Sequence, residues 1–223
     1  MAGWEERAAR GRARFEDGAA RLPDTSDERQ RQLTRMGNAA WGAGLSFLML
    51  GRRADADEWL LRAAETYRES WADAPPGSWG RPIGALKSRL IAGDVDGARE
   101  DARWALAAGA ADSESPIGRY AATLAGLVLG DDAGAAALVP WLAGADAIPP
   151  AVASSLAALA TSDAERYDAA IRDLVADFES REEFLEDVPV ADTVLALQVL
   201  AAARGLDVEL SSVTLPRGPG PGP

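Results

Sequence analysis

The sequence contains no cysteine and no histidine, and these two absences exclude several kinds of chemistry. Without cysteine there is no disulfide and no thiolate nucleophile, and without either residue there is no thiolate or imidazole zinc site and no Ser-His-Asp triad. Lysine is almost absent too, because Lys87 is the only one. The positive charge is therefore carried almost entirely by arginine guanidinium groups.

Long hydrophobic runs are also missing. The strongest apolar run, residues 45–50, is far shorter than the roughly 20 residues that a membrane-spanning helix needs. A longer apolar stretch, residues 124–142, is interrupted by Asp131 and Asp132. The first twenty residues hold four arginines but no apolar core of a signal peptide. We expect a soluble cytoplasmic protein with no membrane partner.

Negative charge dominates, with 35 acidic against 23 basic residues and a formal net charge of −12. Such a surface repels phosphate, so we expect no nucleic-acid partner, and a protein partner is expected to be basic. The acidic excess lies beyond residue 36. The first helix is the exception, because Arg7, Arg10 and Arg14 share one of its faces, and we expect them to bind acidic neighbours.

Helix formers and helix-ending residues predict an all-α chain. Apolar residues make up 48% of the sequence, and alanine, the best helix former, is the commonest of them. Residues 1–216 are expected to form one domain of about 9–10 helices, with an extended strap at 208–215 and a disordered tail at 217–223. The helices are expected at residues 4–22, 26–50, 54–74, 82–92, 95–109, 115–129, 132–143, 150–161, 163–181 and 189–204.

Three segments repeat one pattern, in which an apolar helix ends at a glycine and an alanine follows five residues later. The glycines are Gly51, Gly93 and Gly130, with Ala56, Ala98 and Ala135 in the second helices. A turn between two helices favours glycine because it tolerates positive φ, and closely crossing helices favour alanine. Since one hairpin cannot bury its own apolar face, the pattern predicts stacked antiparallel hairpins, an α-solenoid-like architecture.

These segments resemble degenerate tetratricopeptide repeats over about residues 37–145. The first segment matches best, because Gly44, Phe47, Gly51, Ala56 and Ala63 occupy that family's small and aromatic positions. The later segments depart from the family, with Arg89 and Gly126 where an aromatic residue is expected, and with spacings above 34 residues. Residues 188–216 are also similar to the C-terminal end of some all-α bacterial toxin-immunity proteins.

The tetratricopeptide resemblance implies a set of partner-binding residues, because the first helix of each hairpin lines the concave face in that family. It places Asn38, Trp41, Lys87 and Tyr120 towards the groove, although Trp41 and Tyr120 are equally consistent with a core between repeats. Trp79 lies in a Pro/Gly-rich loop. It either fills a gap between repeats or is exposed for a partner.

Other clusters are better explained without chemistry. The densest acidic cluster, residues 179–187, and the Asp94–Gly97 turn lack the full pattern of a calcium loop. The sequence Gly42-Ala43-Gly44 lies inside an apolar helix and not after a strand, so it does not indicate a phosphate-binding loop. We expect no catalytic residue, no metal and no cofactor.

The sequence therefore predicts a non-catalytic protein- or peptide-binding scaffold that could also self-associate. One alternative is an immunity-type protein that neutralises a basic toxin. Another is a small-molecule-binding or enzymatic α-bundle whose pocket is lined by Trp and Arg. An open groove would favour peptide binding, whereas an enclosed pocket would favour the small molecule.

Overall fold

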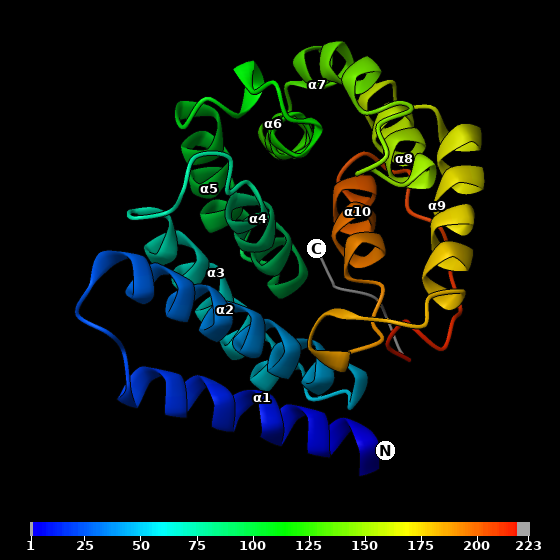
Figure 1. The fold of residues 1–223 in the computed structure, drawn as a ribbon. Coiled ribbons are helices and arrows are strands. Elements are labelled where there is room, and N and C mark those ends of the chain that lie inside the picture. The colour runs from blue at the N-terminus through cyan, green and yellow to red at the C-terminus, as the bar shows by residue number, and fades with distance from the viewer. Residues whose placement is uncertain (1, 218–223) are drawn as a thin grey trace.

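A computed structural model describes residues 2–217, and within them the chain is all-α, with no strand (Figure 1). Apart from Arg217, the predicted disordered tail lies outside the described residues. The helices are α1 (Ala2–Ala20), α2 (Ser26–Met49), α3 (Arg53–Trp71), α4 (Gly80–Ala92), α5 (Val95–Ala107), α6 (Pro116–Leu129), α7 (Asp132–Leu138), α8 (Pro150–Ala160), α9 (Ala164–Glu179) and α10 (Asp192–Ala202). Short 3₁₀ turns are η1 (Ala110–Asp112), η2 (Val139–Trp141) and η3 (Leu185–Asp187).

Each of the ten predicted helices is present, and proline explains two of the corrected boundaries. The helix expected at 132–143 stops at Leu138 and continues as η2, because Pro140 cannot donate the next helical hydrogen bond. The third helix ends at Trp71 and not at residue 74, since Pro75 disfavours helical backbone just before it. The last helix begins at Asp192 and not at 189. None of the helices described is long and apolar enough to cross a membrane.

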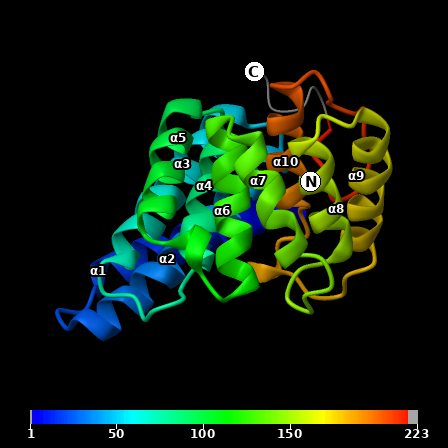
Figure 2. The ribbon, with the colours of Figure 1, turned by 90° about the horizontal axis from the view of Figure 1, so that it is seen from above.

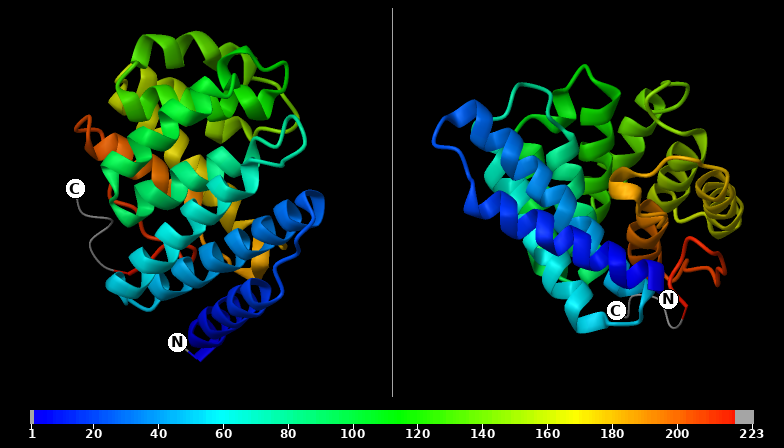
Figure 3. Two further views of the ribbon diagram at one scale, coloured as in Figure 1. Left: turned by 90° about the vertical axis from the view of Figure 1, so that its left-hand side faces the viewer. Right: turned by 60° about the horizontal axis from the view of Figure 1, so that its bottom comes forward.

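The hairpins stack as a curved array. From α1 to α9, each helix packs against the next one in the chain, and α4 also packs on α6 and α6 on α8. Figure 3 shows α1 alongside α2 at one end of the stack, and Figures 1 and 2 show the array curving round to α9. The fold is therefore the predicted stack of antiparallel hairpins.

The turns within three of these hairpins, α2–α3, α4–α5 and α6–α7, share one feature, a glycine with positive φ. Gly93 and Gly130 end their helices with φ of 77°, and Gly51 has φ of 72°. Asp94 and Asp131 follow these glycines and cap the next helix. The side-chain carboxylate of each accepts a hydrogen bond from the backbone N–H three residues further on. Ala56, Ala98 and Ala135 are buried in the second helix of each hairpin, and their small side chains let the two helices pack closely. The sequence pattern thus correctly predicted the conformation of these turns.

The last helix returns into the curve of the array. Helix α10 packs against α4, α8 and α9, and Figures 1 and 2 show it between α4 and α9. The segment after it contacts the last helices, as predicted for the strap: the Gln198 amide donates to the Val208 carbonyl, and the Ser212 hydroxyl donates to the Glu179 carboxylate. The concave side is therefore occupied by the chain's own α10.

The arginines of α1 bind acidic neighbours as predicted, and those neighbours belong to η3. The Arg7 Nε donates to the Asp187 carbonyl at 2.8 Å, and Arg14 forms an ion pair with Glu186. Arg10 donates to the Glu186 carbonyl at 3.1 Å and lies 3.5 Å from the Asp187 carboxylate. We call this contact the arginine clasp. It holds the loop between α9 and α10 against the α1–α2 end of the stack.

Candidate functional site

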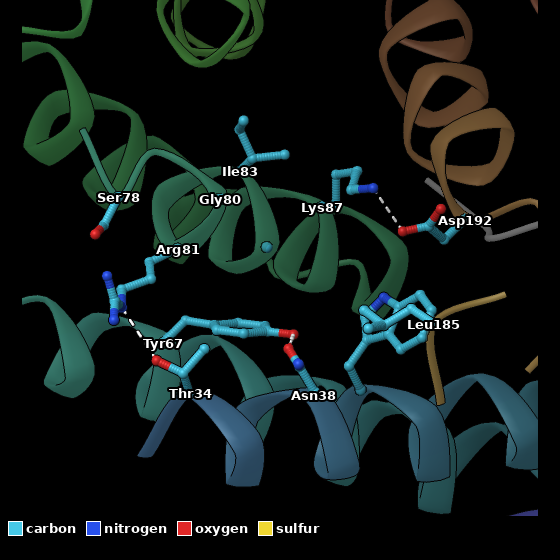
Figure 4. Close-up of a pocket in the computed structure, with 12 residues that line it drawn as sticks. Thr34, Asn38, Tyr67, Ser78, Gly80, Arg81, Ile83, Lys87, Leu185 and Asp192 are labelled. Carbon is cyan, nitrogen blue, oxygen red and sulfur yellow. Dashed lines mark hydrogen bonds and ion pairs between the residues drawn. The ribbon is translucent and has the colours of Figure 1, made fainter. Parts of the chain in front are cut away.

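A half-open cleft of about 400 Å³ lies between α2 and α4, and we call it the central cleft (Figure 4). Helix α2 supplies Thr34, Asn38 and Trp41, which the 4-3 spacing places on one helical face. The other lining residues are Tyr67 of α3, Ser78, Gly80, Arg81, Ile83, Gly84 and Lys87 in and before α4, Leu185 of η3 and Asp192 of α10.

Tyr67 lies between α2 and α4 because two glycines make room for its ring. A Cβ added at Gly37 of α2 would lie 2.9 Å from the ring, and one added at Gly84 of α4 would lie 2.8 Å from it. The Tyr67 hydroxyl donates to Asn38 Oδ1 at 2.8 Å, and burial together with the Asp192 and Glu186 charges raises its pKa. The ring is thus fixed in place with its hydroxyl protonated.

One end of the cleft is closed by an ion pair. Lys87 Nζ lies 2.6 Å from Asp192 Oδ2 and 3.2 Å from the Thr193 hydroxyl (Figure 4 shows the Asp192 contact). Burial disfavours the charge on Lys87, but the attraction and hydrogen bond of Asp192, together with nearby Tyr120, outweigh it, so the pKa of Lys87 lies above its ordinary value. The pair is therefore charged at neutral pH and contributes no net charge.

The other end of the cleft is formed by Arg81, whose guanidinium has only neutral partners among residues 2–217. Its Nε donates to the Thr34 hydroxyl at 3.2 Å and its Nη2 donates to the Gln30 side-chain carbonyl. Arg81 is 8% exposed, and burial lowers its pKa. Because an arginine stays protonated in proteins, this end carries a positive charge.

A second, more open cavity of about 390 Å³ adjoins the central cleft at Arg81. The two cavities share Thr34, Ser78 and Arg81, and the second one adds Arg31 and Arg35 of α2. No carboxylate lines the second cavity among the described residues. Arg31 pairs with Asp27, whereas Arg35 and Arg81 form no ion pair among the described residues, so a locally basic region lies on a chain whose net charge is −12.

Three of the five predicted binding residues come together in the central cleft, namely Asn38, Trp41 and Lys87. Tyr120 is buried near the Lys87–Asp192 pair, which it influences electrostatically, but it does not line the cleft. Trp79 fills a gap in the core, where its ring lies 5.3 Å from that of Trp71. A partner-binding role for the five residues remains a prediction.

Sequence reasoning missed Arg81, Tyr67 and Asp192 as parts of the site. A usable signal existed for the first, because Arg81, Gly84 and Lys87 recur every three residues and so share a face of α4. No local pattern reveals Asp192, which reaches the cleft only because α10 folds back into the array.

Comparison with protein-family models, curated protein sequences and solved structures finds no match to this chain.

Proposed function

We propose that the protein binds a small organic ligand in the central cleft and does not transform it. The observation that carries this proposal is a half-open cavity of about 400 Å³ in which Trp41 and Arg81 both line the wall. Cavities of this size accommodate small ligands, and an apolar wall with a few fixed polar groups is typical of binding sites. Helix α10 occupies the concave side, where a peptide would bind in a tetratricopeptide-like array. These observations favour a pocket over an open groove.

The protonation states in the cleft support binding rather than catalysis. The ion pair with Asp192 keeps Lys87 charged, and the raised pKa of Tyr67 keeps its hydroxyl protonated. A protonated amine is not a nucleophile, and neither group is ready to accept a proton. Both can instead hold a ligand in place by hydrogen bonds, as can the Asn38 side chain.

A binding screen with a cleft-blocking variant tests the proposal. A Cβ at Gly80 meets nothing within 4 Å and Gly80 lines the cleft, so Gly80→Phe should fill the opening without disturbing the core. Small aromatic and aliphatic acids, amides and amines are screened by thermal shift and then by calorimetry. We expect ligands that bind the wild type and fail to bind Gly80→Phe.

The matched control is Ala54→Phe, which adds the same side chain at an exposed position of α3 away from the cleft. It should bind the ligands as the wild type does. A screen without any ligand that distinguishes wild type from Gly80→Phe contradicts the proposal. So does a ligand set that binds both proteins equally.

A protein partner is the second candidate, and one exposed aromatic residue favours it. Trp141 in η2 is 58% exposed, and the Arg119 guanidinium lies 4.7 Å from the centre of its ring. Exposed Trp and Arg are enriched among residues that dominate protein interfaces. A specific complex that Trp141→Ala abolishes and Val213→Ala leaves intact would support this candidate. An equal effect of the two substitutions would count against it.

A further inference from the structure

Arg81 is the most buried cation among the described residues, and none of their carboxylates neutralises its charge. Three other cations, whose side chains are 12–15% exposed, each have a carboxylate within 2.6 Å: Lys87 has Asp192, Arg89 has Asp94 and Asp101, and Arg204 has Asp132. Arg81 forms no ion pair within residues 2–217. A desolvated charge without a counter-charge is costly. Arg81 therefore differs from the arginines that serve only to stabilise the fold.

The geometry around Arg81 leaves it able to bind a ligand. Its hydrogen bonds to Thr34 and Gln30 use Nε and Nη2 and fix the guanidinium plane, whereas Nη1 has no acceptor among the described residues. The side chain lines both the central cleft and the second cavity. A planar guanidinium held in this way is suited to a two-oxygen anion.

The rest of the cleft indicates what the anion is attached to. The Trp41, Tyr67 and Ile83 side chains give the central cleft apolar walls. Asn38 accepts from Tyr67 through Oδ1, which leaves its NH₂ group free to donate to a second polar atom. The charges of Lys87 and Asp192 at the far end cancel each other. The positive charge of Arg81 is therefore the one in the cleft that a ligand anion would neutralise.

We infer that Arg81 binds the carboxylate of a small organic acid whose apolar part lies between Trp41, Tyr67 and Ile83. Within the central cleft Arg81 is the one uncompensated guanidinium among the described lining residues, and it matches the single charge of a carboxylate better than the double charge of a phosphate. This inference rests on the proposed function and names the class of ligand.

Titrations that vary only the charge of the probe test the inference. The probes are benzoate, its neutral counterpart benzamide, and inorganic phosphate, each added to ¹⁵N-labelled protein while the Arg81 Nε–H resonance is followed. We expect benzoate to shift this resonance saturably and to bind at least tenfold more tightly than benzamide. Phosphate should bind more weakly than benzoate.

Substitutions at Arg81 complete the test. Arg81→Gln should weaken benzoate binding at least tenfold, to the affinity of benzamide. Arg81→Lys should bind benzoate with intermediate affinity, because lysine keeps the positive charge but lacks the planar two-donor geometry of the guanidinium. Arg204→Gln is the control, since it removes another shielded guanidinium, just after α10, that does not line the cleft. It should leave benzoate binding unchanged. Circular dichroism checks that each variant is folded.

Equal affinity for benzoate and benzamide, or equal benzoate binding by wild type and Arg81→Gln, overturns the inference. Tighter binding of phosphate than of benzoate overturns the carboxylate assignment. If the Gly80→Phe screen returns only ligands without a carboxylate, the inference fails and the proposed function stands. If that screen returns no ligand specific to the cleft, the proposed function fails as well.

Discussion

Lys87 of α4 and Asp192 at the start of α10 form an ion pair in which Nζ and Oδ2 are 2.6 Å apart. The two side chains are only 15% and 9% exposed, so solvent screens their attraction weakly. Lys87 is the only lysine of the chain, and its partner lies 105 positions away in the sequence. The pair fixes the returning helix in the curve of the array and closes one end of the central cleft.

Breaking this pair should destabilise the protein strongly. Asp192→Asn leaves the Lys87 charge shielded and unpaired, which should cost about 3 kcal/mol of unfolding free energy in urea titrations. Replacing both partners, as in Lys87→Met with Asp192→Leu, should cost much less than the two single changes added together. Glu58→Gln in the exposed Arg62–Glu58 pair should cost under about 0.5 kcal/mol. Additive costs at Lys87 and Asp192 would contradict this role.

Asp101 should be the most sensitive carboxylate of the stack. It is fully buried on α5 and accepts from Arg68 of α3 and Arg89 of α4, at 2.6 Å in each case. Asp101→Asn removes the charge that both guanidinium groups face, so we expect a loss of about 3 kcal/mol, measured by urea unfolding. Asp96→Asn, beside Arg99 at the surface, is the control and should be nearly neutral. A loss below about 1 kcal/mol for Asp101→Asn would refute the prediction.

The protein should lose stability in alkali. Burial raises the pKa of Tyr67, Tyr120 and Tyr167, and attraction by Asp192 raises that of Lys87 against the effect of burial. Unfolded tyrosine and lysine lose their protons from about pH 10 upward. Above that pH the unfolded chain binds fewer protons than the folded chain, so the unfolding free energy falls as pH rises.

Urea unfolding at intervals from pH 7 to pH 11 measures this effect. Stability should be nearly flat from pH 7 to 9, because the chain has no histidine, and should decline above about pH 10. Tyr167→Phe should show a shallower decline, since one of the buried hydroxyls is gone. Stability that stays constant or increases above pH 10 would show that these groups titrate alike in both states.

The turn between α8 and α9 offers a stabilising substitution. Ser162 has φ of 51° at the place where the two earlier hairpins have Gly93 and Gly130, and Asp163 then begins the next helix as Asp94 and Asp131 do. Left-handed backbone is strained for a residue with a Cβ. Ser162→Gly should therefore raise the unfolding free energy by about 0.5–1 kcal/mol, and Gly93→Ala should lower it by about 1 kcal/mol. A loss of stability in Ser162→Gly would contradict this.

Much of the fold could be predicted because its signals are local. Pro116 and Pro150 begin helices, and glycine after an apolar run ends them, as at Gly93 and Gly130. The fourth hairpin turn was not recognised because Ser162 adopts the glycine conformation without being glycine. A pattern based on residue type alone cannot detect that substitution.

The site could be predicted only in part because it depends on contacts between distant segments. Asn38, Trp41 and Lys87 lie on helical faces that a repeat pattern identifies. Asp192 reaches the cleft through the return of α10, and Leu185 through the arginine clasp on the neighbouring Glu186 and Asp187. Arg81 can be recognised as a candidate binding residue only when it is known both to be buried and to have no carboxylate partner.

A crystal structure of the protein with 4-bromobenzoate bound tests the central claim most directly, because the bromine can be located by its anomalous scattering. The account predicts one bromine site in the central cleft near Trp41 and Tyr67, with the carboxylate on the Arg81 guanidinium. Bromine sites only outside the cleft, or a probe in the cleft whose carboxylate points away from Arg81, would contradict it.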